Sequence, residues 1–536
     1  MRAQGETPKA GRREWIGLAV IALPCLLYAM DLTVLNLALP RLSADLQPSS
    51  AQLLWIEDVY GFFVAGLLIT MGNLGDRIGR RRLLLMGAGA FGAASVLAAF
   101  STTAGMLIFA RAVLGIAGAT VAPSTLSLIR NMFLDPRERR VAIGVWIASY
   151  STGSAIGPVL GGVMLEHFRW GSVFLLAVPV MALLLVVGPA LLPEYRDPSA
   201  RRLDLRSAFL SLVAVLSVIY GTKRWAQDGL GWLSVGTVAG GIAVAVAFGR
   251  RQRTLVDPLI DLRLFRVPSF SVSLATYLLG SLIGFGAYFF IGQYLQLVLG
   301  LTPLAAGLWL LPWSGGFVIG SMLTPAIARR MRPAFLMGAG LSLSAIGCAV
   351  LAQVAQTGLA GLVAGLTMFA LGLAPVVALG TDMIVGAAPP EAAGAAAAIS
   401  ETSSELGGSL GIAILGSVGT AIYRHAMAGA ALDGVPLQAM MAARDTLGGA
   451  TAVAARLPGQ AGEHLLATAR AAFGQALQVT VTACAVIATL AAVLAVVALR
   501  HVRVPAAAPE LASPEVLRPR KSRAPATPPA LRPPLA

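Results

Sequence analysis

Charged side chains are scarce in this sequence of 536 residues. Asp, Glu, Lys and Arg make up 12% of it, whereas a soluble globular protein carries about 25%. Apolar residues account for 57%, and the mean hydropathy is +0.78. A soluble multidomain enzyme is therefore excluded, and the apolar residues suffice for about fourteen membrane-spanning helices of about 20 residues each.

Cysteine and histidine are also rare. Cys25, Cys348 and Cys484 each stand alone inside an apolar run, so neither a disulfide framework nor a metal site is indicated. The four histidines fall in expected loops or at helix ends. A membrane-embedded metalloenzyme, acyltransferase or protease would lack its ligands or its base. The sequence also lacks a GxxxxGK[ST] loop, which excludes ATP as the energy source.

Apolar runs bounded by glycine, proline and charged residues predict fourteen transmembrane helices. The first run continues through Asp31 and is longer than the apolar core of a signal peptide, so we expect it to remain as a helix. The expected spans are 15 to 39, 51 to 72, 83 to 101, 105 to 130, 141 to 165, 171 to 192, 207 to 222, 233 to 249, 270 to 293, 303 to 327, 334 to 355, 359 to 385, 393 to 422 and 476 to 499.

The basic residues predict the orientation of these spans. With the amino terminus in the cytoplasm, 31 of the 40 Lys and Arg residues lie on that side and eight on the other. This bias follows the positive-inside rule, so both termini are expected in the cytoplasm of a multi-pass protein of the cell membrane. The net charge of +15 then reflects topology, and no nucleic-acid partner is expected.

A short internal repeat predicts the domain organisation. Residues 83 to 89 read LLLMGAG and residues 334 to 340 read AFLMGAG, each after a basic stretch. The offset relates the third span to the eleventh, whereas two six-helix repeats alone would relate it to the ninth. Two helices are therefore inserted between parallel halves, an architecture typical of transporters. The expected parts are a cytoplasmic amino terminus 1 to 14, a six-helix bundle 15 to 192, inserted helices 207 to 249, a six-helix bundle 270 to 499 with an outer loop 423 to 475, and a disordered cytoplasmic tail 500 to 536.

The loop after the second span carries Gly72, Asp76, Arg77, Gly79 and Arg80. The glycines permit a tight turn, Asp76 can cap a helix, and the arginines hold the loop against an anionic leaflet. A basic loop that only fixes topology is the simpler interpretation. This string resembles the signature loop of the major facilitator superfamily, in which the Asp and the basic residues form a charge relay between the halves.

Further strings extend this resemblance along essentially the whole chain. Residues 111 to 118 (RAVLGIAG) resemble the arginine motif of the superfamily, and residues 30 to 40 (MDLTVLNLALP) resemble the signature of its fourteen-helix drug:proton antiporters. The resemblance is closest to quaternary-ammonium and multidrug exporters. It implies proton-coupled export of lipophilic, cationic drugs or antiseptics by a monomer that needs no cofactor beyond the proton gradient.

The fifth span resembles the motif associated with the antiporters of this superfamily, through Gly153, Gly157, Pro158, Gly161 and Gly162. Pro158 removes a backbone hydrogen bond and kinks the helix, and the glycines form a smooth face that another helix can approach closely. Packing alone is one interpretation. In the family this helix lines the interface between the halves.

Five ionisable residues inside the spans are candidates for proton coupling and cation binding: Asp31, Asp58, Arg111, Glu401 and Glu405. Each charge at a helix centre costs about 2.5 to 3.5 kcal/mol on insertion scales, so a purely structural use is unfavourable. The first three lie about 9 to 12 Å from the outer ends of their helices, and Arg111 is expected beside one of the two aspartates. Glu401 and Glu405 face the same way, and their repulsion favours a proton on one of them. A polar helix that only lines water is the alternative for these two.

Two other acids, Glu57 and Asp382, are interpreted as structural or as part of a vestibule. Aromatic side chains could present their faces to a lipophilic cation, although such residues often pack or face lipid. The tenth span carries no acid, unlike some exporters of multivalent cations in the family, which argues against divalent substrates. The candidate substrate-lining aromatics are Trp55, Tyr60, Tyr288, Trp309 and Trp313.

The outer segment 423 to 475 is long for a hairpin, and its stretches 436 to 447 and 463 to 475 predict two short amphipathic helices. A gate and a spacer are both open interpretations. The alternative function is export of an endogenous neutral or anionic natural product, as in antibiotic self-resistance. Uptake by symport and a sensor that does not transport are less favoured by the motif of the fifth span and by the acids.

Overall fold

The computed structural model describes residues 9 to 196, 204 to 228, 231 to 255, 258, 260 to 388, 393 to 428, 437 to 457 and 460 to 501. Helices are the only regular elements in these ranges, so the all-α fold class is confirmed. Most of the expected amino-terminal segment and all but two residues of the expected tail lie outside the described residues.

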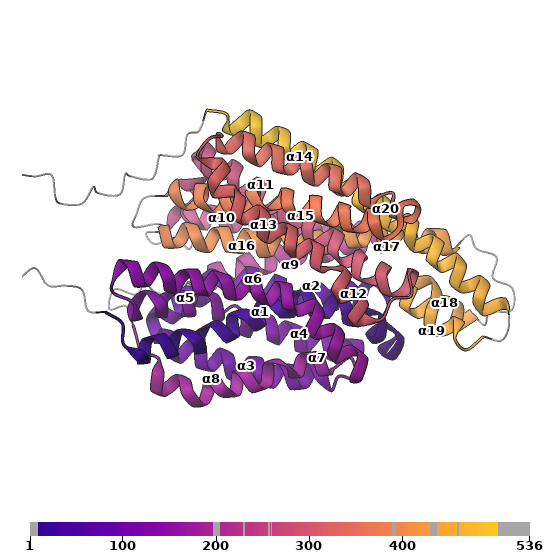
Figure 1. Cartoon of the computed structure of the whole chain (residues 1–536), viewed down its shortest axis with the longest axis horizontal. Coiled ribbons are helices and arrows are strands. Elements are labelled where there is room, and N and C mark those ends of the chain that lie inside the picture. Colours follow the sequence, from indigo (N-terminus) through magenta and orange to yellow (C-terminus); the bar gives the residue numbers. More distant parts are fainter. Residues whose placement is uncertain are drawn as a thin grey trace, which may run out of the picture. The chain divides into compact units, whose positions relative to one another are not determined.

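The helices are labelled in Figure 1. The first group comprises α1 (Arg12–Leu46), α2 (Ser50–Ile78), α3 (Arg80–Ala99), α4 (Ala104–Gly118), α5 (Val121–Met132), α6 (Pro136–His167), α7 (Ser172–Leu175) and α8 (Ala177–Leu191). Next come α9 (Leu205–Asp228) and α10 (Trp232–Thr254). The last group comprises η1 (Leu264–Arg266), α11 (Pro268–Gln293), η2 (Tyr294–Val298), α12 (Pro303–Trp309), α13 (Leu311–Ala328), α14 (Pro333–Leu351), α15 (Val354–Gly386), α16 (Ala393–Gly411), η4 (Ile412–Gly416), α17 (Ser417–Ala428), α18 (Leu437–Asp445), α19 (Leu447–Ala454) and α20 (Gln460–Leu499).

Thirteen stretches of described helix are long and apolar enough to cross a membrane. The remaining expected span, 141 to 165, lies in α6, a helix of 32 residues. Its glycine, serine and threonine residues between 149 and 157 make it less apolar than the other spans. The seventh span was expected to end at residue 222, but α9 continues to Asp228, which brings two basic residues into the helix.

Local signals explain where several helices begin. Ser49 caps α2 by accepting a hydrogen bond from the Gln52 amide at 3.2 Å, and the Gln52 side chain accepts one from the Ser49 amide at 3.0 Å. Asp135 caps α6 through the amides of the next two non-proline residues. Pro303 and Pro333 occupy the first turns of α12 and α14, where a missing N–H costs nothing.

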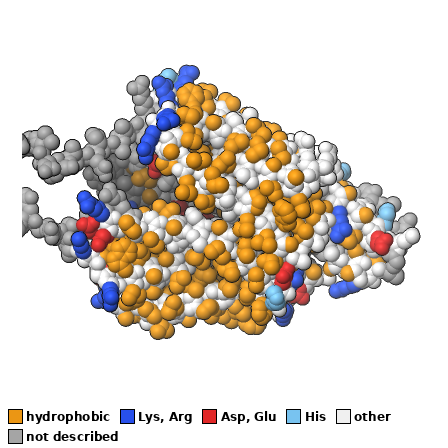
Figure 2. Space-filling view, viewed as in Figure 1, with side chains coloured by type: hydrophobic (Ala, Val, Ile, Leu, Met, Phe, Trp, Pro, Cys, Tyr) orange, Lys and Arg blue, Asp and Glu red, His pale blue; other side chains and the backbone are white. Residues whose placement is uncertain are grey.

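We define two ends of the helix bundle. The loop end holds the loop between α2 and α3, and the hairpin end holds α18 and α19. Helices α1 to α8 pack mainly among themselves, as do α11 to α20, and these two groups form the two layers seen in Figure 1. Figure 2 shows hydrophobic side chains across the middle of the visible face, with charged side chains toward its ends.

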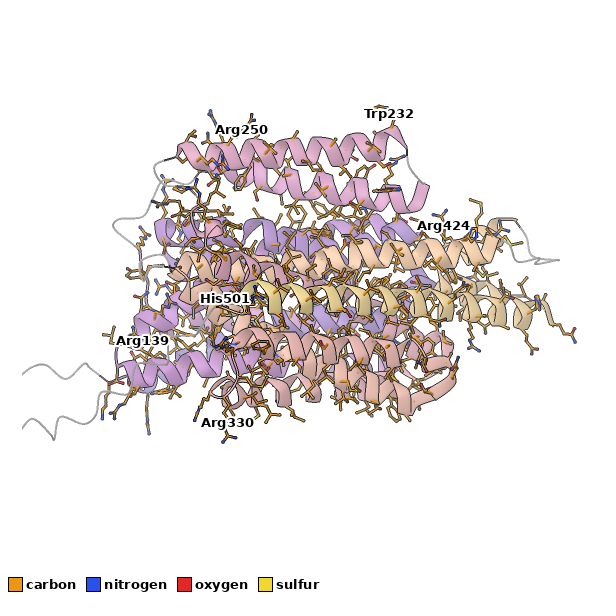
Figure 3. The ribbon with its side chains drawn as sticks, turned by 90° about the horizontal axis from the view of Figure 1, so that it is seen from above. Arg139, Trp232, Arg250, Arg330, Arg424 and His501 are labelled. Atoms are coloured by element: carbon orange, nitrogen blue, oxygen red, sulfur yellow. The ribbon has the colours of Figure 1, made fainter. Side chains whose placement is uncertain are left out.

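The inserted helices α9 and α10 form an antiparallel pair at the edge of the bundle. Figure 3 shows α10 on the outside of this pair, with Trp232 and Arg250 near its ends. Helix α9 covers α10 on the inner side and also contacts α2, η4 and α17. It therefore touches both layers along the seam where α2 packs against α16.

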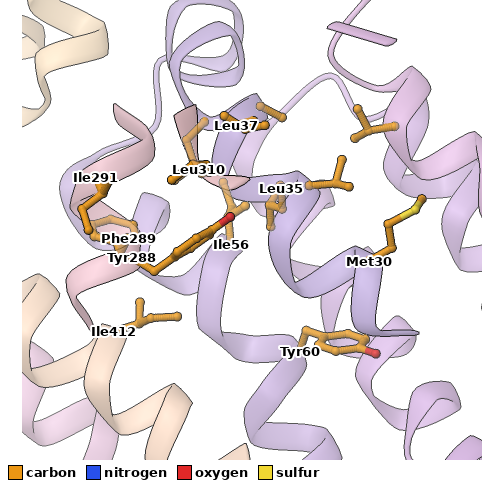
Figure 4. Close-up of a cluster of buried hydrophobic side chains, with 14 of the residues drawn as sticks. Met30, Leu35, Leu37, Ile56, Tyr60, Tyr288, Phe289, Ile291, Leu310 and Ile412 are labelled. Carbon is orange, nitrogen blue, oxygen red and sulfur yellow. The ribbon is translucent and has the colours of Figure 1, made fainter. Parts of the chain in front are cut away.

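The two layers meet closely at the hairpin end. The Gln296 side chain on η2 donates a hydrogen bond to the Leu37 carbonyl of α1 at 3.0 Å. The apolar cluster in Figure 4 joins side chains of both layers there, among them Leu37 and Ile56 from one layer and Tyr288 and Leu310 from the other. This end of the bundle is closed by apolar packing.

The glycines of α6 pack against two different helices, α1 and α12. Gly153, Gly157 and Gly161 follow one face of α6, and a Cβ atom at any of them would collide with α1. Gly162 faces the other layer, where a Cβ atom would lie 2.6 Å from the Leu304 Cα atom of α12. Toward the loop end, Gly144 has no neighbouring atom within 4 Å of its Cβ position. Of these glycines, Gly162 is the one that faces α12.

We therefore expect Gly162→Ala to destabilise the protein by about 1 to 3 kcal/mol, because the added carbon meets the α12 backbone, which cannot rotate away as a side chain can. Thermal unfolding of the purified protein in detergent measures this. Gly144→Ala is the matched control on the same helix and should lose nothing, since its Cβ enters open space. Equal losses of stability in the two variants would contradict the close approach of Gly162 to α12.

Candidate functional site

Arg111 and Asp31 form a buried ion pair between α4 and α1. The guanidinium Nη1 lies 2.5 Å from Asp31 Oδ2, and Arg111 is 1% exposed. Arg111 Nε also donates to the Ile56 carbonyl at 3.1 Å, and its guanidinium carbon lies 4.7 Å from the Tyr60 ring centroid. The structure thus places Arg111 beside one of the two aspartates expected from the sequence.

Asp58 has a different partner, which the sequence interpretation missed. Lys223 of α9 places its Nζ atom 2.9 and 2.7 Å from the two carboxylate oxygens of Asp58, and both side chains are almost completely buried. The Trp55 ring centroid lies 4.0 Å from the same ammonium. The seventh span was predicted to end at residue 222, one residue before Lys223. The sequence feature that could have indicated this pair is a lysine directly after an apolar run.

Glu57 is more central than the sequence suggested. Its side chain is buried, and Oε2 has no hydrogen-bond partner among the described residues. The 100° offset from Asp58 turns Glu57 away from Lys223, but both acids still reach the same cavity. From the sequence, Glu57 and Asp382 were interpreted as structural or as part of a vestibule. In the structure, Glu57 lines the cavity. Asp382 is exposed near the end of α15.

Glu405 links the two layers. Its Oε1 accepts a hydrogen bond of 2.7 Å from the Tyr28 hydroxyl of α1. Gly61 of α2 allows this approach, because a Cβ atom there would collide with the Ser409 hydroxyl of α16. Glu401 lies one turn away on α16, half-buried, and it does not line the same cavity.

A small cavity of about 30 Å³ lies between α2, α4, α11, α16 and η4. Three carboxylates from the two layers line it, beside the apolar ring of Phe285 and the Arg111 guanidinium. In the described conformation this space has room for about two water molecules, and its walls combine an apolar face with negative charge. The lining residues are Glu57, Asp58, Gly61, Arg111, Phe285, Ser404, Glu405, Gly408, Ser409 and Ile412.

The five candidate aromatics lie outside the walls of this cavity. Trp55 covers the Lys223 ammonium, and Tyr60 lies under Arg111. Tyr288 and Trp313 contact each other with ring centroids 5.8 Å apart, and Trp309 packs against the apolar core. A role for these aromatics in substrate contact stays a prediction.

The signature loop ties the helices of one layer together. Gly79 adopts φ +110°, a conformation that favours glycine. Arg80 is buried and holds Asp76 at 2.5 Å, while its Nη1 donates to the Pro123 carbonyl of α5 at 3.3 Å. Arg77 is exposed, and Gly72 packs near Pro123. Among the described residues, the polar partners of the Arg80 side chain are Asp76 and Pro123, both in the layer of α1 to α8.

The outer segment folds as α18 and α19, and its last part forms the beginning of α20. Gly448 and Gly449 lie inside α19, and Gly448 packs closely against Ser43 of α1. Burial raises the pKa of Asp445 at the end of α18, although Arg424 at 3.7 Å opposes this rise.

The thirteen membrane-length apolar helices of the described residues define a multi-pass membrane protein, and a small polar cavity lies inside it. The chain belongs to the Major Facilitator Superfamily, whose family model matches residues 21 to 412. It is 44% identical over 497 residues to the multidrug efflux pump LfrA of Mycolicibacterium smegmatis, covering 92% of this chain and 98% of the relative. It is 36% identical over 467 residues to the methyl viologen resistance protein SmvA of Salmonella typhimurium, covering 86% and 93%.

The fold is also similar to a solved structure of a bacterial homolog to the human lysosomal transporter Spinster, in an inward-facing and unoccupied conformation. The TM-score is 0.62 at 18% identity, with 92% of this chain and 98% of that chain covered. These comparisons confirm the family that the sequence motifs indicated, and the multi-pass membrane fold.

The Arg111–Asp31 pair should be coupled in stability. Arg111→Met or Asp31→Asn alone leaves its buried partner uncompensated and should cost about 3 to 5 kcal/mol, whereas the double variant should cost clearly less than the sum. Unfolding of the purified variants in detergent measures this cycle. Arg169→Ala, which breaks an exposed pair with Asp45, is the control and should change stability little. Additive losses would contradict the coupling.

Proposed function

We propose that this protein is a proton-coupled antiporter that exports lipophilic, cationic drugs or antiseptics across the cell membrane. The observation that carries this proposal is the cavity in which Glu57 and Asp58 of one layer meet Glu405 of the other beside Phe285. Carboxylates in such a space can bind either protons or a cation. The proposal is supported by the similarity to a multidrug efflux pump and to a methyl viologen resistance protein.

Proton and substrate compete for the same negative charge in this mechanism. A lipophilic cation enters from the cytoplasm, places its apolar body against Phe285 and its charge near the acids, and is carried outward. Protons from the outside then neutralise the acids, which lowers the affinity for the cation and allows it to leave. The proton gradient supplies the energy, and the transporter works as a monomer without a cofactor.

Two halves that rock about this cavity provide alternating access. We assign residues 15 to 192 and 270 to 499 to these halves, with 207 to 249 as the inserted pair. The loop end is cytoplasmic in this assignment, since most basic residues belong there. The layers are packed together at the hairpin end, which supports a conformation that is closed toward the outside.

Protonation of Glu405 affects a contact between the two halves. While it is ionised, it accepts a charge-assisted hydrogen bond from Tyr28 of the opposite layer. A proton on Glu405 removes that charge and weakens the tie between α1 and α16. Proton binding would therefore loosen the contact that must break when the halves rock.

The test is ethidium uptake into everted membrane vesicles under an imposed pH gradient. The native protein should accumulate dye when the lumen is acidic. Glu405→Gln should lower the gradient-driven rate about tenfold or more, because the side chain can no longer exchange a proton. Glu401→Gln beside it shows which of the two acids carries the coupling.

Glu463→Gln is the matched control, because it makes the same change on an exposed residue at the start of α20. It should leave uptake unchanged. Native uptake that ignores the pH gradient would overturn proton coupling, and a Glu405→Gln variant with native uptake would overturn the role of Glu405. Transport of neutral or anionic compounds alone would favour the alternative, export of an endogenous natural product.

A further inference from the structure

The Lys223 ammonium occupies a site with the composition of a cation-binding box. Asp58 supplies two carboxylate oxygens at 2.9 and 2.7 Å. The faces of Trp55 and Phe62 lie 4.0 and 5.9 Å from the nitrogen at their centroids. Aromatic faces around an ammonium, with a carboxylate on one side, are the arrangement that proteins use to bind organic ammonium ions.

The residue type at this position is itself informative. Of the 40 basic residues in the sequence, 37 are arginine, and the other two lysines are Lys9 and Lys521 in the terminal segments. Arginine would bind a carboxylate through a planar fork, whereas lysine presents a compact point charge on a flexible stem. Lys223 therefore resembles the head of an alkylammonium ion in both charge and shape.

The helix that carries Lys223 is held in register along α2. Three contacts follow each other at intervals of four residues on α2. Asp58 binds Lys223, Phe62 packs with Ile219, and Gly66 lies against Leu212, which is within 2.7 Å of its Cβ position. The contacting residues on α9 follow in the reverse order, at intervals of four and seven residues, so α9 is antiparallel to α2. This packing fixes the position of the Lys223 ammonium.

Asp58 also lines the central cavity, so its carboxylate can be reached from two sides. We propose that Lys223 is a tethered occupant of a cation site, and that a lipophilic organic monocation in the cavity replaces its ammonium at Asp58 and Trp55. This inference rests on the proposed function and adds to it the place where the positive charge of the substrate binds.

Exchange of one ammonium for another avoids the main cost of binding at a buried acid. At no stage does Asp58 remain as an unpaired charge in the apolar interior, which would be strongly unfavourable. The lysine stem is long, and α9 ends at Asp228, five residues or about 7.5 Å further on, so the displaced ammonium can extend toward the hairpin end. One-for-one exchange also favours monocations over dications at this box.

The test is ethidium binding to the purified full chain in detergent, followed by fluorescence. Lys223→Met removes the tethered competitor, so the dissociation constant of ethidium should fall about tenfold. Lys223→Arg keeps a competing charge and should not show this gain. In the double variant Asp58→Asn/Lys223→Met the gain should disappear, because the carboxylate that attracts the dye is gone.

Arg224→Gln is the matched control, because it removes one positive charge from the adjacent position without touching Asp58. It should leave the dissociation constant unchanged, as should Lys223→Met when the probe is Nile red, a neutral lipophilic dye. A Lys223→Met variant that folds and binds ethidium no more tightly than the native protein would overturn the inference.

A second measurement uses the native chain and does not depend on the stability of a variant. The Lys223 amine should react with dinitrofluorobenzene several times faster when ethidium is saturating, because displacement frees it from Asp58. Peptide mass mapping can follow Lys223 alone, since the other two lysines lie near the termini. A rate that ethidium leaves unchanged or lowers would contradict displacement. A native protein that binds no organic cation would instead overturn the proposed function.

Discussion

A charge inside this bundle must have a partner, and the arrangement of the central helices depends on that requirement. Because an isolated ion in an apolar interior is unfavourable, three of the acids are tied to a group on another helix, whereas Glu57 is buried with no hydrogen-bond partner for its Oε2 atom among the described residues. Asp31 holds Arg111 across α1 and α4, Asp58 holds Lys223 across α2 and α9, and Glu405 accepts from Tyr28 of α1. The first two pairs act within one layer or at its edge, and the third joins the two layers.

These pairs determine which carboxylates of the cavity are balanced by a basic side chain. Arg111 and Lys223 balance Asp31 and Asp58, whereas Glu57 and Glu405 have no salt-bridge partner among the described residues. Glu57 Oε2 lacks a hydrogen-bond partner among the described residues, and Glu405 faces the seam between the layers. In the proposed mechanism, a proton or an organic cation changes the charge balance at the place where the two halves separate.

Much of the fold and part of the site were predictable, because membrane burial is a local property of sequence. Long apolar runs indicated the spans, and the motif strings indicated the family. The positions of Asp31 and Arg111 along their helices predicted that both lie at a similar depth. In the structure they form an ion pair. Lys223 was missed because its partner lies 165 residues away and the polar residues after it resemble a loop. Trp55 and Tyr60 were expected at the substrate; the sequence did not indicate that their rings also lie against Lys223 and Arg111.

The sequence by itself determined that this chain is an all-α membrane protein, because its long apolar runs satisfy their backbone groups within a bilayer as helices and the charged residues mark the ends of the spans. The motif strings indicated a transporter. The sequence also identified the acids in the first, second and thirteenth spans as unusual. Only the tertiary structure decided which charge pairs with which, that Glu57 faces the cavity, and that α9 lies over the seam between the layers. These facts depend on the rotation and register of helices far apart in the chain, which side-chain packing sets and local periodicity does not encode.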